Sequence, residues 1–194
     1  MPILSALRRR LVTLRDAMDA RLHPRRRARA RERLRRLGPS TVLFICLGNV
    51  CRSPFAGRLL AAHGLGGVSV DSAGFIGPGR APPEEAIAAA KALGLDHADH
   101  CSKIVTASML AAADVVFVFD RGNVRRLRSA HGARLDRTFW IGDFDPEWAG
   151  KRAIIDPWGK APEESDRTFA RIARCVDEVA QLLGDTQPHH ERVT

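Results

Sequence analysis

The chain has 194 residues, of which 45% are hydrophobic and 27% charged, and its formal net charge is +9. Such a length and composition are typical of one globular domain with an extension. The apolar runs are too short for a membrane-spanning helix, and no apolar stretch of the signal-peptide type follows the first arginines. Four cysteines in a chain of this length do not indicate a disulfide framework, so we expect a reduced, cytoplasmic setting.

The positive charge is concentrated in the first part of the chain. Residues 1–37 contain 13 of the 31 Lys and Arg residues and only three of the 22 acidic residues, so the remainder is almost neutral. Apolar residues recur there at steps of three or four, which predicts a helix with an apolar stripe. They are Leu4, Leu7, Leu11, Leu14, Met18 and Leu22. Pro24 is expected to break this helix, and residues 25–37 form a second, more basic helix candidate.

A basic helical extension over residues 1–39 admits several roles. A solvated, poorly ordered segment is the simplest interpretation, and Asp16, Asp19 and Glu32 count against a transit peptide. Arginines around an apolar stripe favour docking on anionic lipid or on an acidic protein partner, and lipid docking would make the protein peripheral at a membrane. Nucleic acid is another polyanion, and we do not expect it to be the ligand.

From residue 41 onward, short apolar strands alternate with helices. Strands are predicted at residues 41–46, 68–71, 114–119 and 137–141, and helices at residues 54–63, 83–93, 107–113, 123–129 and 165–183. Gly64 and Gly184 stand where the first and last of these helices should end. The alternation predicts a doubly wound α/β fold, a four-stranded parallel sheet with helices on both faces. We assign this domain to residues 40–186 and expect a flexible tail at residues 187–194.

The stretch FICLGNVCRSPFAGRLL, residues 44–60, joins the first strand of the domain to its first helix. Serine followed by proline commonly starts a helix, whose unpaired N–H groups and partial positive charge suit an anion. A loop that contains Gly-Asn can turn its successive amides inward as a nest, and an arginine adds a planar fork that matches two phosphate oxygens. The junction therefore predicts a phosphate site made of Leu47, Gly48, Asn49, Val50, Cys51, Arg52 and Ser53.

Cys46 ends the strand at the mouth of this phosphate site. The helix dipole and Arg52 favour the thiolate form of Cys46, and a thiolate beside a bound phosphate is a nucleophile aimed at phosphorus. Ser53 can donate a hydrogen bond to that sulfur. Taken alone, Cys46 or Cys51 would be interpreted as a buried apolar residue. Only the combination with Arg52, Ser53 and the strand–loop–helix context favours catalysis. The other two cysteines lack the paired spacing of a zinc site, so we expect no metal and no cofactor.

The segment CLGNVCRS, residues 46–53, resembles the Cys-x5-Arg-Ser signature of the low-molecular-weight protein tyrosine phosphatases. Further segments are similar to the same family, namely VDSAG at 70–74, VVFVFDRGNVRRL at 115–127 and IIDPWGK at 154–160. The resemblance covers about residues 41–184 and excludes the N-terminal extension. It implies a metal-independent phosphatase that hydrolyses phosphotyrosine on proteins through a phosphocysteine intermediate. In this family the partner is often a tyrosine autokinase.

The resemblance also assigns catalytic roles at the matching positions. Cys46 would be the nucleophile and Arg52 the phosphate clamp. Asp156 would protonate the leaving oxygen and then activate the water that hydrolyses the phosphocysteine, since an unprotonated leaving oxygen is costly to expel. Asp143 and Asp145 are rivals for this role, because Asp145 also precedes a proline.

Other positions match supporting residues of the family. Asn49, Ser53, Ser72 and His100 would hold the phosphate loop in shape, although a second histidine in GLDHADHCSK leaves the alignment of His100 open. Cys51 would be a redox guard that protects Cys46 by forming a reversible disulfide, and simple packing is the alternative.

The walls of the substrate slot are the least typical feature. Leu47, Val50 and Trp158 would supply its apolar sides, whereas the loop after Ser72 is short and offers only Phe75. Val50 lacks the hydroxyl of the threonine that arginine-phosphatase relatives carry at this position, which favours phosphotyrosine.

Two other functions remain as alternatives. An arsenate reductase of the same fold needs resolving cysteines after the third strand, and FDRGNVRRLRSAHG contains none. A catalytically weak phospho-binding module, anchored by the basic arm, is disfavoured because Cys46, Arg52 and Asp156 are all present.

Overall fold

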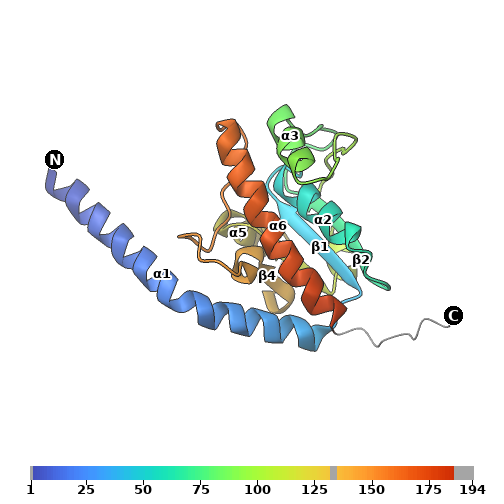
Figure 1. The fold of residues 1–194 in the computed structure, drawn as a ribbon, viewed down its shortest axis with the longest axis horizontal. Coiled ribbons are helices and arrows are strands. Elements are labelled where there is room, and N and C mark those ends of the chain that lie inside the picture. Colours follow the sequence, from blue (N-terminus) through green and yellow to red (C-terminus); the bar gives the residue numbers. More distant parts are fainter. Residues whose placement is uncertain (1, 132–134, 186–194) are drawn as a thin grey trace.

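A computed structural model describes residues 2–131 and 135–185, and for residues 2–16, 130, 131 and 135 it describes the backbone alone. The tail expected at residues 187–194 lies outside the described residues. The sheet has four parallel strands in the order β2-β1-β3-β4, which confirms the predicted fold class (Figure 1). The strands are β1 (Thr41–Cys46), β2 (Ser69–Gly74), β3 (Val115–Val118) and β4 (Thr138–Trp140).

Each helix predicted within the domain is present, with shifted ends. The helices are α2 (Arg52–Ala62), α3 (Glu84–Ala92), α4 (Ala107–Ala112), α5 (Arg121–His131) and α6 (Pro162–Gly184), and two short 3-10 turns flank β4, η1 (Leu135–Arg137) and η2 (Ile141–Phe144). Gly64 follows α2 and has a φ of 63°, the left-handed conformation typical of a glycine just after the end of a helix. Gly184 is the last residue of α6 itself, so its predicted position beyond the helix is wrong.

The strands alternate their side chains between two apolar layers, because successive residues of a strand point to opposite faces. On one face, Val42 and Phe44 of β1 join a core with α2, α3 and α6. On the other face, Leu43 and Ile45 of β1 pack in a second core with residues of α4 and α5. Both faces of the sheet are therefore covered, which explains why its strands read as continuous apolar runs.

The N-terminal arm is one helix, α1 (Pro2–Leu37), so the expected break at Pro24 is wrong. A proline removes one backbone hydrogen bond and commonly bends a helix without ending it when tertiary contacts hold the turns beyond it. Figure 1 shows α1 as a single bent helix whose C-terminal half lies along the domain. No described helix is long and apolar enough to cross a membrane.

The C-terminal half of α1 docks on the domain through apolar and charged contacts. Leu34 is fully buried, and Arg27 and Arg31 both form ion pairs with Glu178 of α6. His23 Nε2 lies 3.1 Å from the carbonyl oxygen of Asp145. This half is thus not the solvated, poorly ordered segment considered from the sequence.

The apolar stripe predicted for the first turns of α1 falls mostly outside the described side chains. These are the side chains of Leu4, Leu7, Leu11 and Leu14. Of the stripe residues that are described, Met18 is 62% exposed and therefore does not pack on the domain.

The order of the strands fixes where a ligand can bind. The chain leaves β1, returns in β2 on one side of it, and then crosses to β3 on the other side. At such a switch point the loops after neighbouring strands separate, and ligands of doubly wound folds bind in the crevice at the carboxyl ends of the strands. The loops after β1 and β3 contain the Cys46 motif and Asp120, respectively.

Candidate active site

The loop between β1 and α2, together with the first turn of α2, places two hydrogen-bond donors on the sulfur of Cys46. The backbone N–H of Asn49 donates to Cys46 Sγ at 3.2 Å, and the hydroxyl of Ser53 donates to it at 3.1 Å. Cys46 itself is buried at the end of the central strand, with 3% of its surface exposed. Donors to sulfur stabilise the thiolate over the thiol, so this arrangement suits a nucleophilic cysteine.

Asn49 holds the loop in the shape that makes these contacts. It is the one non-glycine residue with positive φ, 52°, in the described part of the chain, and asparagine tolerates this left-handed conformation better than most residues. Its side-chain amide donates to the hydroxyls of Ser53 (3.0 Å) and Ser72 (2.9 Å). Its Oδ1 accepts from the backbone N–H of Lys103 at 2.9 Å. The predicted supporting residues Asn49, Ser53 and Ser72 are thus brought together.

Gly74, the last residue of β2, has to be a glycine because the loop lies directly on it. A Cβ at this position would lie 2.8 Å from the backbone nitrogen of Asn49 and 2.9 Å from the carbonyl carbon of Gly48. Such contacts are too short for real Cβ atoms, and backbone cannot move aside as a flexible side chain can. The glycine in VDSAG is therefore part of the phosphate loop's support.

The start of α2 differs from the sequence prediction. The helix begins at Arg52, its N-cap is Cys51, and no side chain caps it. Ser53 was expected to cap a helix beginning at Pro54, which is wrong. Its hydroxyl hydrogen can serve only one acceptor at a time, and it is directed at Cys46 Sγ and the carbonyl of Ala73 (3.3 Å). The serine therefore serves the cysteine and the neighbouring strand.

Arg52 is buried, with 1% of its surface exposed, and its guanidinium is held on two sides. Nη1 donates to Asp120 Oδ2 at 2.8 Å and to the carbonyl of Ile154 at 3.0 Å, while Nη2 lies 2.7 Å from Asp156 Oδ2. Nε is buried and has no hydrogen-bond partner among the described residues. A guanidinium fixed in this way keeps Nε as a free hydrogen-bond donor for an anion beside Cys46.

The charges around Arg52 keep it protonated in spite of its burial. Burial alone would lower the pKa of its guanidinium, but the negative charges of Cys46, Asp156 and Asp120 outweigh this effect and raise the pKa above its ordinary value. The site therefore combines one obligatory cation with groups that carry negative charge.

The three candidate acids lie in different surroundings. Asp156 alone contacts Arg52, and its side chain is 37% exposed, so it can reach a substrate. Asp143 forms an ion pair with Arg152 and is almost buried. Asp145 is fully buried and pairs with Arg171 at 2.8 Å. This geometry favours Asp156 as the acid and gives the two rivals structural partners of their own.

Residues 41–189 match the family of low molecular weight phosphotyrosine protein phosphatases. The chain belongs to this family. Among its curated relatives is the probable low molecular weight protein-tyrosine-phosphatase EpsP of Ralstonia nicotianae, which is 32% identical over 138 residues, or 71% of this chain and 91% of the relative. The α1 helix precedes the matched region.

Solved structures of the family have the same fold. The tyrosine phosphatase Wzb of Escherichia coli K30 in complex with sulphate is 26% identical, with a TM-score of 0.67 over 75% of this chain and 99% of its own. The YwlE arginine phosphatase of Geobacillus stearothermophilus is 29% identical, with a TM-score of 0.69 over 79% of this chain and 99% of its own. These two structural neighbours are named as phosphatases of two different side chains, tyrosine and arginine.

Asp120 is a member of the phosphatase site that the sequence prediction missed. One of its oxygens accepts from Arg52, and the other accepts from the backbone N–H of Asn123 at 2.8 Å, which caps α5. Asn123 in turn accepts from the backbone N–H of Phe119 at 3.1 Å. Asp120 could have been predicted from the sequence, because it directly follows a buried strand, at the edge of the sheet where ligands bind.

The two histidines of GLDHADHCSK have separate environments. His100 Nε2 lies 2.7 Å from the carbonyl oxygen of Asn49, and burial lowers its pKa. His97 is fully buried near Phe55 and Phe169, neither ring nitrogen has a partner among the described residues, and burial lowers its pKa to about 4. His100 is thus the histidine that the fold brings to the phosphate loop.

The mouth of the site has a cation in addition to the predicted apolar walls. Leu47 is partly exposed and Trp158 is 52% exposed, but Val50 is 4% exposed and offers little surface. Arg80 donates to the carbonyls of Gly48 (3.0 Å) and Gly77 (2.8 Å), and its guanidinium lies 5.8 Å from the centre of the Trp158 ring. Arg80, which sequence reasoning missed, therefore ties the loop after β2 to the phosphate loop.

Cys51 is buried beside Cys46, with 3% of its surface exposed. Burial raises the pKa of its thiol to about 12, and the negative charges of Cys46 and Asp156 act in the same direction. Cys51 is therefore a neutral thiol at physiological pH. In residues 2–131 and 135–185, no group of three or more His, Cys, Asp or Glu side chains could hold a metal ion.

Proposed function

We propose that this chain is a metal-independent phosphatase that hydrolyses phosphotyrosine on proteins through a phosphocysteine intermediate. The observation that carries the proposal is the environment of Cys46, whose sulfur accepts hydrogen bonds from Asn49 and Ser53 in the loop that Arg52 closes. We assign catalysis to residues 40–186. The arm, residues 1–39, would dock the protein on anionic lipid or on an acidic protein partner. A reduced nucleophile requires a reducing compartment, which is the reason to infer a cytoplasmic setting.

In the first step, the Cys46 thiolate attacks the phosphorus of the substrate and the bond to the tyrosyl oxygen breaks. The free Nε of Arg52 and the amides of residues 47–53 would bind the phosphoryl oxygens, neutralising charge as the transition state forms. Because Asp120 and Ile154 already fix the guanidinium, little reorganisation is needed when the phosphate arrives. The products of this step are a phosphocysteine and the leaving tyrosine.

The leaving oxygen needs a proton, and Asp156 is placed to give it. A bound phosphate dianion would compete for the Arg52 guanidinium that now holds Asp156, so substrate binding would free Asp156 to face the leaving oxygen. As the general acid, Asp156 would donate a proton to the tyrosyl oxygen. The resulting carboxylate then accepts a proton from the water that attacks the phosphocysteine and releases phosphate.

Phosphotyrosine is the favoured substrate because the entrance combines a half-exposed aromatic ring with an apolar side chain. Trp158 and Leu47 would contact an aromatic leaving group, and Val50 has no hydroxyl to offer a guanidinium leaving group. The structural likeness to an arginine phosphatase makes phosphoarginine the second candidate. A phosphorylated protein is the partner in both cases, and the family resemblance points to a tyrosine autokinase.

The first experiment compares hydrolysis of p-nitrophenyl phosphate, in the presence of EDTA, by the wild type and by Cys46→Ser. Turnover that persists in EDTA and is lost in the variant supports the cysteine mechanism. Surviving activity in a folded Cys46→Ser protein would place the nucleophile elsewhere, and an inactive, reduced wild type would favour a phospho-binding module. Matched peptides with phosphotyrosine or phosphoarginine then decide the substrate, and a higher kcat/KM for phosphoarginine would overturn the tyrosine proposal.

A further inference from the structure

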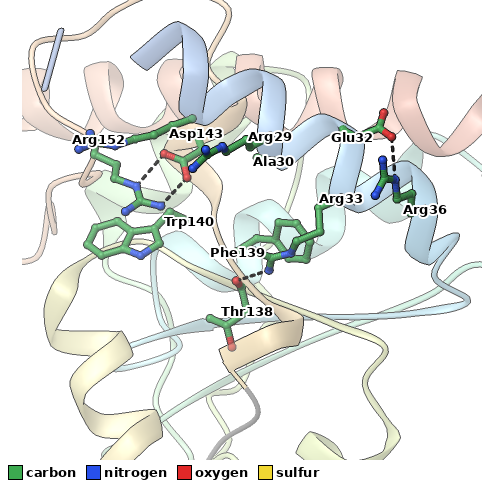
Figure 2. A pocket seen from close by; sticks show the side chains of 11 residues that line it. Arg29, Ala30, Glu32, Arg33, Arg36, Thr138, Phe139, Trp140, Asp143 and Arg152 are labelled. Atoms are coloured by element: carbon green, nitrogen blue, oxygen red, sulfur yellow. Dashed lines mark hydrogen bonds and ion pairs between the residues drawn. The ribbon is translucent and has the colours of Figure 1, made fainter. Parts of the chain in front are cut away.

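A hollow lies between the docked half of α1 and the β4 edge of the domain (Figure 2). Its volume is about 470 Å³, which is within the range of small-ligand pockets. The arm supplies Arg26, Arg29, Ala30, Glu32, Arg33 and Arg36, and the domain supplies Thr138, Phe139, Trp140, Asp143 and Arg152. The hollow therefore exists only because α1 is docked.

The lining of this arm hollow is strongly cationic. Five arginines face two carboxylates, and the ion pairs are local: Arg36 with Glu32, and Arg152 with Asp143. Arg29 and Arg33 have no carboxylate within ion-pair distance among the described residues. Two guanidiniums without a direct ion-pair partner in one concave site attract a ligand with more than one negative charge.

Two of the guanidiniums are also held in fixed orientations by aromatic rings. Arg33 lies 3.7 Å from the centre of the Phe139 ring and donates to the carbonyl of Thr138 at 2.7 Å. Arg152 lies 4.5 Å from the centre of the Trp140 ring and binds Asp143 through two hydrogen bonds of 2.7 and 2.6 Å. Stacked, pre-oriented guanidiniums lose little entropy when they bind an anion.

The arm hollow is connected to the candidate active site by a short stretch of chain. Arg152 lines the hollow, and Asp156, four residues later, reaches Arg52. Four residues span at most about 14 Å between their Cα atoms. An extended substrate could therefore place one phosphoryl group at Cys46 and a second anionic side chain in the hollow. The concave shape suits a single side chain better than the flat surface of a bilayer.

We propose that the arm hollow binds a second phosphorylated side chain of the protein substrate, a few residues from the phosphotyrosine. The proposal rests on the proposed function, because it gives that active site a preference for multiply phosphorylated segments. Arg29 and Arg33 contact the second phosphoryl group, and the docked α1 helix is a part of substrate recognition.

The test compares peptides that contain one phosphotyrosine and, four to eight residues away on either side, either serine or phosphoserine. For the wild type we expect kcat/KM to be higher for the doubly phosphorylated peptide at one spacing, and Arg29→Gln to reduce this preference about fivefold, the effect of a lost exposed ion pair. Arg35→Gln, on the same helix but not lining the hollow, should keep the preference. Both variants should hydrolyse p-nitrophenyl phosphate at the wild-type rate.

A direct binding measurement separates this proposal from the proposed function. Fluorescence anisotropy with a peptide that contains phosphoserine and no phosphotyrosine requires no catalysis, so it reports on the hollow even if the phosphatase proposal fails. Tighter binding to the wild type than to Arg29→Gln supports the hollow as a phosphoryl site. Equal binding, or loss of binding to phosphatidylserine vesicles without any loss of peptide binding, would overturn it.

Discussion

The guanidinium of Arg52 and the carboxylate of Asp156 form an ion pair of 2.7 Å between Nη2 and Oδ2. The arginine is buried at the start of α2, whereas the aspartate is partly exposed in the loop before α6. The pair joins the phosphate clamp and the candidate acid across the mouth of one site. Because a phosphate dianion would bind the same fork, we expect substrate binding to release Asp156 toward the leaving group.

Asp156→Ala should slow hydrolysis in proportion to the basicity of the leaving oxygen. For phosphotyrosine peptides we expect kcat to fall by about 10²–10⁴-fold, because general acid catalysis contributes that much. For aryl phosphates with activated leaving groups the loss should be far smaller. The measurement is kcat across a series of substituted phenyl phosphates, and equal losses on all of them would contradict an acid role. Asp143→Ala, which alters an acid that pairs with Arg152, is the matched control.

Arg171 of α6 is expected to position the acid loop. Its Nε donates to the buried Asp145, and Nη1 and Nη2 donate to the carbonyls of Ala153 (3.0 Å) and Lys151 (2.6 Å). Removal of one partner of a buried ion pair leaves the other charge uncompensated, so Arg171→Gln should lower the free energy of unfolding by about 3 kcal/mol. In protein that remains folded, kcat for phosphotyrosine peptides should fall more than phosphate affinity does.

Arg174→Gln is the control for this effect. Arg174 also reaches Asp145, at 3.2 Å, but its side chain is 35% exposed and donates to no loop carbonyl among the described residues. Urea unfolding and kcat are measured for both variants. Equal effects of the two substitutions would show that Arg171 acts only as one of two counter-ions and does not position the loop.

Cys51 is expected to protect Cys46 during oxidation. With its pKa raised to about 12 by burial, Cys51 remains a thiol at neutral pH and does not compete for the phosphate. Once peroxide has converted Cys46 to a sulfenic acid, the neighbouring thiol can condense with it to a disulfide that reductants reverse. During prolonged peroxide treatment the unprotected sulfenic acid of Cys51→Ser should be oxidised further to a sulfinic acid, which dithiothreitol does not reduce. The wild type should therefore recover its activity in dithiothreitol, and Cys51→Ser should not. Equal recovery of the two proteins would show that Cys51 serves only in packing.

His97 should make the fold sensitive to acid. Its pKa in the folded protein is about 4, whereas an unfolded histidine titrates near 6.5, so between these values the unfolded chain binds the proton more strongly. The free energy of unfolding should therefore fall as the pH decreases from about 6.5 to about 4, by a total of about 3 kcal/mol. The charged neighbours His100, Arg58, Asp96 and Asp99 contribute to the size of this effect.

The variant His97→Phe removes the titrating group and keeps an aromatic ring beside Phe55 and Phe169. We expect its unfolding free energy to be nearly constant over the same pH range, as measured by urea denaturation at each pH. His63→Phe, at a site with 34% side-chain exposure, controls for the loss of an imidazole as such. If the unfolding free energy of His97→Phe fell with pH as much as that of the wild type, groups other than His97 would be responsible for the acid sensitivity.

The phosphate loop could be predicted from sequence because its information is local. Cys46, Asn49, Arg52 and Ser53 lie within eight consecutive positions, and the strand and helix that hold them have clear apolar patterns. The apolar strands likewise predicted the sheet, since burial on both faces requires continuous apolar runs. The family resemblance assigned the acid role to Asp156 with Asp143 and Asp145 as rivals, and of these three only Asp156 contacts Arg52.

The features that could not be predicted depend on contacts between distant segments. Arg80 reaches Gly48, Asp120 reaches Arg52 and Arg171 reaches the acid loop, yet none of these pairs has a spacing that sequence periodicity can reveal. Pro24 was expected to break the arm because local propensity disfavours proline within a helix. Docking of the following turns on α6 and η2 overrides that propensity.

Phosphorylation of Cys46 can be detected directly if the intermediate is trapped before it is hydrolysed. The Asp156→Asn variant, which should be slow to hydrolyse the intermediate, is mixed with p-nitrophenyl phosphate, whose activated leaving group needs little help from an acid, then quenched in acid and digested for mass spectrometry. We expect one added phosphoryl group on Cys46 of the variant, and none on the wild type once its turnover is complete. Release of p-nitrophenol with no phosphoryl group on Cys46 at any quench time would contradict the phosphocysteine mechanism.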